Sequence, residues 1–270
     1  MAAAIGRAAR GCGVLSPGRL RVTWVSGRHG ARPMASSSSR SLLSVEERSR
    51  LDTYLDTLFE YNARMNLTAV KDKKEAEERH IEDSLALLPI LDSVSPGGER
   101  GRPKVIDVGT GAGLPGVVVA VMRENWEVTL LDSLQKRCKF LSDVKERIGL
   151  GNATVRWGRA EDVGRDQEEG REAYDIAVAR AVAELRVLVE LCAPMVRVGG
   201  HIVAAKGPSP EEEIVAAGNA LEQLNCEVVR VDDVPSFGAK GQRTVVVIRK
   251  VEETPEKFPR QPGKPNKRPL

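Results

Sequence analysis

The sequence is poor in aromatic side chains and in long apolar runs. Aromatic residues make up 4% of its 270 residues, so a core of the size that this length allows must be mainly aliphatic. No apolar run approaches the roughly 18 residues that a membrane-spanning helix needs. The cysteines Cys12, Cys138, Cys192 and Cys226 lack the spacing of a metal site or a redox motif. We therefore expect no membrane partner, no bound metal, and free thiols in a reducing compartment.

Acidic residues are absent before Glu46, although the same stretch contains seven arginines. Without those arginines the formal net charge changes from +3 to −4. An acid-free segment rich in arginine and serine is typical of an organellar transit peptide, and no long apolar stretch suggests secretion. We therefore predict that residues 1–43 are a transit peptide that directs the protein to the chloroplast, with the mitochondrion as the alternative destination. A disordered tail is the simpler alternative.

The next part of the chain has a helical pattern. Ser44 and Glu47 have the spacing of a capping box, which opens a helix. A second helix is expected to end near Pro89. Residues 95–103 are rich in glycine and proline and form a loop by composition. Residues 44–94 are thus predicted to be an N-terminal helical extension.

Strand and helix patterns alternate from residue 104 to residue 251. The expected strands are Lys104–Val108, Val128–Asp132, Thr154–Gly158, Tyr174–Ala179, His201–Ala205, Glu227–Val231 and Thr244–Arg249. The expected helices are Gly116–Arg123, Leu134–Ile148, Glu184–Val196 and Glu211–Leu224. Such alternation predicts an α/β fold with a mostly parallel sheet covered on both faces. No helix separates the last two strands, so the seventh is expected to be antiparallel, as in a Rossmann-like class I methyltransferase fold.

Glycines are concentrated directly after the first expected strand. Gly109, Gly111 and Gly113 spell G-x-G-x-G, but from Gly111 onward the same loop spells the dinucleotide fingerprint G-x-G-x-x-G. In a parallel open sheet, ligands bind beyond the carboxyl ends of the strands. Asp132 ends the second strand, where an acid can bind the hydroxyls of a ribose. S-adenosylmethionine (SAM) and NAD both carry an adenosine, so both ligands fit this pattern.

Three details favour SAM. Asp107 lies inside the first strand, where a carboxylate can orient the loop or face the cationic groups of SAM, but is a poor neighbour for a pyrophosphate. Ala160 and Glu161 follow the third strand, where an acid or a backbone amide can pair with the adenine amino group. Pro115 falls near the first position of the next helix, where proline is tolerated. We predict SAM as the cofactor and keep a NAD-dependent oxidoreductase as the alternative.

The stretch after the fourth expected strand, residues 175–185, lacks two devices of nucleobase methyltransferases. It contains no Asn/Asp-Pro-Pro-aromatic sequence for exocyclic amines and no cysteine nucleophile for pyrimidine carbon. Cys192, in the following helix, is expected in the core. Guanine N7 needs neither device, because its lone pair can attack a sulfonium methyl without losing a proton. We therefore expect no general base, and we expect Arg180, at the end of the strand, to shape the acceptor pocket.

Seven segments of the chain match a known pattern in order. They are NLTAV (66–70), RHIEDSL (79–85), IDVGTGAGLPG (106–116), LLDSLQKRCKFL (130–141), ARAVAEL (179–185), AAKG (204–207) and FPRQPGKPNKRPL (258–270). On these segments the chain resembles the bacterial small-subunit ribosomal RNA methyltransferase G family (RsmG, also called glucose-inhibited division protein B, GidB). The resemblance spans nearly everything from Ser44 to Leu270.

The resemblance implies SAM-dependent methylation of N7 of one guanosine in 16S-type small-subunit rRNA, near the decoding centre. The implied partner is this rRNA within the 30S-type subunit or its precursor, and a monomer is expected. A catalytically silent RNA-binding ribosome-assembly factor is the alternative outside enzymes. The implied cofactor-binding residues are Gly109, Leu114, Asp132, Ala160, Glu161 and Arg180, to which the residue patterns above add Asp107, Gly111 and Gly113.

Basic side chains elsewhere are candidates for RNA contact. Arg79 and His80 could face RNA, although His80 shares one helix face with Asp83 and Ser84 and could equally belong to a packing cluster. Lys206 ends the fifth expected strand and could contact a phosphate or be a solvated lysine. We predict contact with RNA for Arg79, His80 and Lys206 and leave these alternatives open.

The last residues, 252–270, form a basic tail. From Lys257 onward it contains no acid and four prolines, which we expect to keep it extended. Because the body is net acidic, RNA must be bound by a local basic patch, and this tail is one. The expected RNA contacts in the tail are Arg260, Lys264, Lys267 and Arg268.

Overall fold

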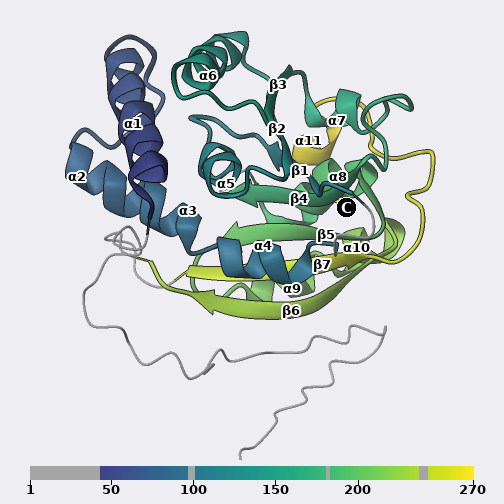
Figure 1. Cartoon of the computed structure of the whole chain (residues 1–270). Helices are drawn as coiled ribbons and strands as arrows, with labels where there is room; N and C mark the ends of the chain where they lie inside the picture. The colour runs from purple at the N-terminus through teal and green to yellow at the C-terminus, as the bar shows by residue number, and fades with distance from the viewer. Residues whose placement is uncertain (1–42, 97–100, 181–182, 237–242) are drawn as a thin grey trace, which may run out of the picture.

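The computed structural model describes residues 43–96, 101–180, 183–236 and 243–270 (Figure 1). Apart from residue 43, the predicted transit peptide lies outside these residues, so its prediction stays untested. Residues 181–182, which follow Arg180, and residues 237–242, between the last two strands, also lie outside them.

A seven-stranded sheet runs through the described residues in the order β3-β2-β1-β4-β5-β7-β6. Its strands are β1 (Lys104–Val108), β2 (Glu127–Asp132), β3 (Ala153–Trp157), β4 (Tyr174–Arg180), β5 (Val196–Lys206), β6 (Cys226–Val234) and β7 (Arg243–Lys250). The pairs from β3 to β5 are parallel, and β7 is antiparallel to both β5 and β6. The predicted mostly parallel α/β sheet with an antiparallel last strand is confirmed.

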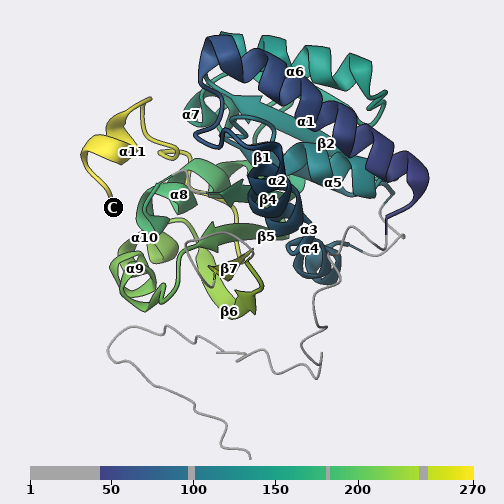
Figure 2. The ribbon, with the colours of Figure 1, turned by 90° about the vertical axis from the view of Figure 1, so that its left-hand side faces the viewer.

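Successive strand residues serve two separate apolar cores, because their side chains point to opposite faces of the sheet. In β1, Val105 belongs to the first core and Ile106 to the second. Figure 2 shows the helices in two layers. The first core lies under α1 (Val45–Met65), α5 (Gly116–Met122) and α6 (Gln135–Arg147), and the second under α8 (Leu185–Cys192), α9 (Glu211–Ala216) and α10 (Gly218–Gln223). With both faces covered, the strand ends are where a ligand can approach.

The N-terminal helices belong to the same body as the sheet. The predicted capping box opens α1: the Glu47 N–H donates to Ser44 Oγ (3.1 Å) and the Ser44 N–H donates to Glu47 Oε2 (2.7 Å). Further along α1, the buried Tyr54 donates from its hydroxyl to the carbonyl of Ala112 (2.9 Å), which lies in the glycine loop. The helical extension therefore supports the loop that follows β1.

The second predicted helix is a series of short turns. It comprises α2 (Lys73–Ala76), a π-helical turn (Glu77–Glu82), α3 (Asp83–Leu85) and α4 (Leu88–Val94). The prediction that it ends near Pro89 is wrong. Pro89 lies in the first turn of α4, where the missing N–H of proline has no helical partner to lose.

Two later helices are also shorter than predicted. The helix expected to reach Val196 ends in a 3₁₀ turn, Ala193–Met195, and β5 begins at Val196 itself. The helix expected over Glu211–Leu224 is divided at Ala217 into α9 and α10.

Candidate cofactor site

The glycine loop after β1 is closely packed against the first core. A Cβ atom on Gly113 would lie 2.5 Å from Cγ2 of Val117 and 2.8 Å from Cδ2 of Leu141, and the φ of Gly113 is +95°. A Cβ atom on Gly116 would lie 2.3 Å from Cδ2 of Leu130. Glycine is therefore required at both positions by the protein's own packing, which holds the loop close to the end of β1.

Asp107 is fully buried beneath this loop. Its Oδ2 accepts from Thr110 Oγ1 (2.6 Å) and from the Gly116 N–H (2.8 Å). Its Oδ1 is also buried and has no hydrogen-bond partner among the described residues. Burial raises the pKa of Asp107 to about 6, although its two hydrogen bonds and the charge of Arg180 lower it. The two hydrogen bonds orient the loop, which is one of the two roles predicted for Asp107. The unpaired Oδ1 leaves the carboxylate able to attract a cation, which is the other predicted role.

Asp132 joins the end of β2 to the glycine loop. Its Oδ2 accepts from the Gly111 N–H (2.9 Å) and lies 3.3 Å from Nη1 of Arg137. Its Oδ1 accepts from the Leu134 N–H (2.8 Å). Oδ1 has a further lone pair, so Asp132 can still accept from a ribose hydroxyl.

A cavity of about 160 Å³ opens at the carboxyl ends of β1, β2 and β3. Its lining includes Gly109, Asp132, Ser133, Arg159, Ala160, Glu161 and Asn266. Four of the predicted cofactor residues therefore share one cavity. Ala160 and Glu161 begin a short helix, α7 (Ala160–Val163), which was not predicted. Asn266, in the C-terminal tail, was not predicted at this site either.

The other predicted cofactor residues do not line this cavity. Gly111 and Gly113 belong to the loop, and Leu114 is buried in the first core. Arg180 ends β4, and burial lowers its pKa while Tyr54 and Asp107 oppose that shift. Arg180 is thus close enough to the carboxylate beneath the loop for their charges to interact, and its role in an acceptor pocket stays a prediction.

Tyr54 is a functional candidate that the motifs did not identify. It is fully buried, and burial raises the pKa of its hydroxyl. A buried tyrosine hydroxyl needs a partner, so a tyrosine on the otherwise apolar face of α1 was the available signal.

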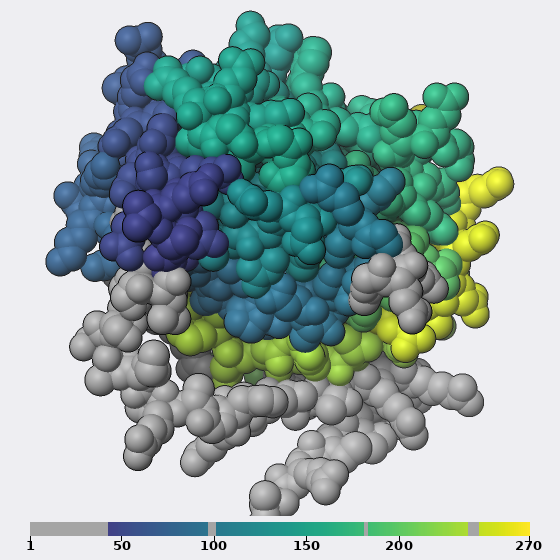
Figure 3. All heavy atoms as spheres, viewed as in Figure 1, coloured from purple at the N-terminus to yellow at the C-terminus, as the bar shows by residue number. Residues whose placement is uncertain are grey.

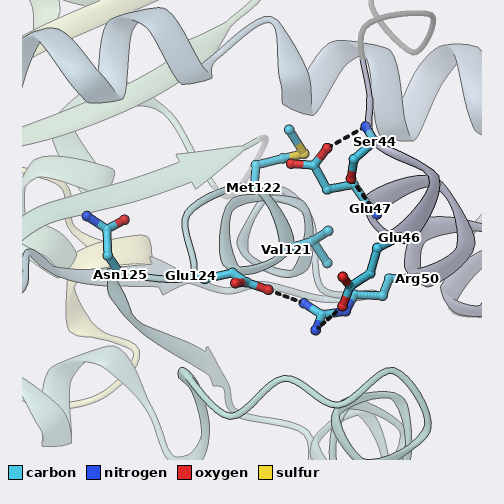
Figure 4. Close-up of a pocket in the computed structure, with 8 residues that line it drawn as sticks. All are labelled: Ser44, Glu46, Glu47, Arg50, Val121, Met122, Glu124 and Asn125. Atoms are coloured by element: carbon cyan, nitrogen blue, oxygen red, sulfur yellow. Dashed lines mark hydrogen bonds and ion pairs between the residues drawn. The ribbon is translucent and has the colours of Figure 1, made fainter.

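A larger cavity, of about 390 Å³, lies at the opposite edge of the sheet (Figure 4). It is lined by the start of α1 and by Glu124 and Asn125, which precede β2. Arg50 pairs with Glu46 one turn away on α1 (3.0 Å) and bridges to the opposite wall through Glu124 (2.6 Å). Because it lies at the amino ends of the strands and is crossed by these ion pairs, we regard it as a helix-docking contact.

The two residues of the N-terminal helices that were predicted to contact RNA, Arg79 and His80, bond to neighbouring residues of the protein. Arg79 pairs with Glu75 (2.6 Å). His80 is buried, and its Nε2 lies 2.8 Å from Thr68 Oγ1. Burial lowers the pKa of His80 to about 4, so its ring is neutral at pH 7. Ser84 Oγ donates to the His80 carbonyl (2.5 Å), which supports the packing-cluster alternative for His80.

Lys206 and Arg260 are also held inside the protein. Lys206 Nζ lies 2.6 Å from Glu213 Oε2 and donates to the Ala183 carbonyl (2.6 Å), and its side chain is 8% exposed. It is therefore not a solvated lysine. Arg260 donates to the fully buried Glu190 from its backbone N–H (2.9 Å), Nε (2.8 Å) and Nη2 (2.5 Å).

The expectation of an extended tail is wrong where the tail reaches the body. Phe258 and Pro265 are buried, and residues 264–267 form a helical turn, α11 (Lys264–Lys267). The prolines permit this path because Pro265 lies in the first turn of α11. Lys264, Lys267 and Arg268 remain exposed, so their predicted RNA contacts stay predictions.

The family model described as "rRNA small subunit methyltransferase G" (GidB) matches residues 47–246. The chain belongs to this family. The ribosomal RNA small subunit methyltransferase G of Symbiobacterium thermophilum is 49% identical over 225 residues, which cover 80% of this chain and 87% of that protein. The protein of the same name from Moorella thermoacetica is 41% identical over 228 residues, which cover 84% and 92%. That from Pelotomaculum thermopropionicum is 40% identical over 246 residues, which cover 90% and 97%.

Membership of the methyltransferase G family confirms the resemblance inferred from the motifs. It supports neither the NAD-dependent oxidoreductase nor the silent assembly factor. Burial raises the pKa of the Cys192 thiol, which agrees with a core role. Among the described residues, no helix is long and apolar enough to cross a membrane, and no three potential metal ligands cluster.

The residues at the cavity fit the cofactor of a class I methyltransferase. Asp132 offers carboxylate lone pairs to a ribose diol, and apolar side chains such as Val108 and Leu191 line the same space for a purine ring. The unpaired Oδ1 of Asp107 suits a ligand with positive charge.

Proposed function

We propose that this chain transfers a methyl group from SAM to N7 of a guanosine in small-subunit rRNA. The observation that carries the proposal is the family match over residues 47–246, together with a cavity at the carboxyl ends of the strands that these residues line, with Asn266 added from the tail. The relatives carry the name of a small-subunit rRNA methyltransferase. The choice of N7 is supported by residues 175–185, which contain neither the Asn/Asp-Pro-Pro-aromatic sequence nor the cysteine nucleophile that other acceptor atoms require.

The protein's own residues act by binding and orientation. When bound, SAM supplies a methyl group on a positively charged sulfonium. Asp132 and the glycine loop hold the nucleoside half, and Asp107 fixes the loop through Thr110 and Gly116. Arg180 lies at the end of β4, where the acceptor base would approach. Such positioning and charge complementarity are sufficient for a nucleophile that loses no proton on attack.

Methyl transfer from labelled SAM tests this proposal. The full chain is incubated with small ribosomal subunits that lack their own N7-methylguanosine, and the product is mapped by cleavage at the modified base. A single labelled guanosine near the decoding centre is expected. Subunits without label, with SAM binding still measured by calorimetry, would contradict the acceptor. Absence of SAM binding would contradict the cofactor.

The natural substrate is proposed to be the 30S-type subunit or its precursor in an organelle. Support comes from the acid-free, arginine-rich residues 1–43. Fusing these residues to a fluorescent protein tests the destination, and fluorescence in chloroplasts is expected. Mitochondrial fluorescence would select the alternative organelle, and diffuse cytosolic fluorescence would contradict both.

A further inference from the structure

The C-terminal tail is anchored to the body before it reaches the cofactor cavity. Arg171 donates to the carbonyl of Thr254 and, from Nη1, to that of Phe258 (2.9 Å). Further along, Arg260 donates three hydrogen bonds to the carboxylate of Glu190. Glu190 belongs to α8 and has no exposed surface, so the tail is fixed on the outside of that helix.

A third anchor brings α11 to the mouth of the cavity. The backbone N–H of Gly263 donates to Glu161 Oε1 (2.8 Å), and Pro265 is buried. Figures 1 and 2 both place α11 beside α7 and α8, and in the space-filling view the tail lies along the surface at the edge of the molecule (Figure 3). Asn266 lines the cavity together with Glu161 and Leu191.

Asn266 is available to a ligand. The residue is exposed at the cavity, and among the described residues its side chain has no hydrogen-bond partner. Its carboxamide carries both a donor and an acceptor. Glu161, in contrast, is an acceptor when ionised, and its Oε1 already accepts from Gly263.

An adenine edge requires both a donor and an acceptor from the protein. Its exocyclic amino group donates, and the neighbouring ring nitrogen accepts. An asparagine carboxamide matches this pair and forms two hydrogen bonds with adenine. A carboxylate alone can satisfy only the amino group. Asn266 therefore supplies the donor that the predicted Ala160-Glu161 pair lacks among its side chains.

We propose that Asn266 recognises the adenine ring of the bound cofactor and is held in place for this by the anchored tail. The inference rests on the proposed function, because it takes SAM as the ligand of the cavity. It gives the tail a role in cofactor selection, in addition to the RNA contacts predicted for its exposed basic residues.

Calorimetry with two ligands tests this role. The full chain and its Asn266→Leu variant are titrated with S-adenosylhomocysteine (SAH) and with its analogue whose purine lacks the exocyclic amino group. In the variant we expect SAH to bind about tenfold more weakly, as the loss of two hydrogen bonds to the base edge implies. The amino-free analogue should lose much less, about twofold to threefold, because only one of the two hydrogen bonds was available to it.

Two further variants separate recognition from a general effect. Asn266→Asp keeps an acceptor and loses the donor, so its loss of SAH affinity should lie between those of the wild type and Asn266→Leu. Asn219→Ala, on the exposed side of α10, is the matched control and should bind SAH like the wild type. The melting temperatures of all variants should agree, since neither asparagine is buried.

The outcomes are distinct. Unchanged SAH affinity in Asn266→Leu would overturn the inference, and so would equal losses for the two ligands, because a structural role does not depend on the amino group. Wild-type protein that binds neither SAM nor SAH would instead overturn the proposed function itself.

Discussion

The glycine loop and the C-terminal tail line the same cavity, but they are held there by different means. The two carboxylates that fix the loop lie near it in sequence: Asp107 accepts from Gly116, 9 residues away, and Asp132 accepts from Gly111, 21 residues away. Tyr54, 58 residues from Ala112, adds one hydrogen bond to the loop from α1. The tail is fixed by acids far from it, with Glu190 70 residues from Arg260 and Glu161 102 residues from Gly263. One wall of the site is thus set by local structure and the other by long-range ion pairing.

The two walls also differ in what their loss would do. At Gly113 and Gly116 the loop packs without space for a side chain, so a substitution at either position creates a clash. The tail depends on a buried charge pair, so a substitution there leaves a charge without its partner. The predictions below disturb one wall at a time.

The largest effect is expected from the tail substitution Arg260→Met. It leaves the fully buried Glu190 carboxylate without its cation, which should lower the free energy of unfolding by about 3–5 kcal/mol. Urea denaturation measures this loss. The double variant Arg260→Met/Glu190→Gln, which removes both charges, should recover part of the stability. A loss below about 1 kcal/mol in the single variant would show that the tail contributes little to the fold.

In the loop, Gly113→Ala is expected to cost about 2–3 kcal/mol of stability and to weaken SAM binding at least about tenfold. The new Cβ would meet Val117 at 2.5 Å, and alanine is strained at a φ of +95°. Gly149→Ala is the control, because its φ is +65° but the space around it is open. It should show the backbone strain alone, with normal SAM affinity. Equal effects of the two substitutions would contradict the packing argument.

The charge of Asp107 should make cofactor preference depend on pH. Its pKa is raised to about 6, so the carboxylate is ionised at pH 7.5 and mostly protonated at pH 5. Only SAM carries the sulfonium charge, so its affinity relative to SAH should fall by about threefold to tenfold between these pH values. Calorimetry at both pH values measures the ratio. Asp107→Asn should remove the dependence, and a ratio that does not change in the wild type would refute it.

In the protein without ligand, the same raised pKa makes the stability fall, and not rise, as the pH increases. Because the folded pKa of Asp107 is raised, its contribution to stability is present below the unfolded pKa of 3.8 and is lost as pH rises through about 6. A cationic ligand offsets this loss by favouring the ionised form. The stability gained from SAM over SAH should therefore grow as the pH rises.

The smallest effect on the cavity is expected from removing the exposed charges of the tail. The triple variant Lys264→Ala/Lys267→Ala/Arg268→Ala leaves the Arg260 anchor in place, so SAM affinity should stay within about twofold. For binding to small-subunit rRNA, the logarithm of the binding constant falls linearly with the logarithm of the salt concentration, and this slope should be less steep by about 1 to 3 in the variant. An unchanged slope would exclude the three side chains from RNA contact.

The difference between the two walls also explains what the sequence could predict. The glycines, Asp107 and Asp132 follow strands whose apolar pattern is clear, and parallel strands bring their carboxyl ends together. The mostly parallel sheet and the four cavity residues Gly109, Asp132, Ala160 and Glu161 could therefore be predicted without coordinates. Their individual roles toward the cofactor stay predictions.

The remaining residues depend on contacts that no local pattern encodes. In the sequence Lys206 resembled an exposed lysine, because its partner Glu213 lies in the following helix. Only the packing of that helix brings Glu213 next to Lys206. Arg260 resembled a phosphate ligand because Glu190 is far away in sequence. Asn266 carries no motif, and the same tail conformation decides its position. Only Tyr54 gave a signal, a hydroxyl on an apolar helix face.

The anchored tail also gives the cavity an expected order of formation. The acids that hold the tail, Glu161 and Glu190, precede β5, and the donors that meet them, Arg260 and Gly263, follow β7. The whole sheet must therefore form before the tail can be fixed, whereas the glycine loop needs only β1, β2 and the elements beside them. During refolding, the wall that carries Asn266 is thus expected to be the last part of the cavity to form.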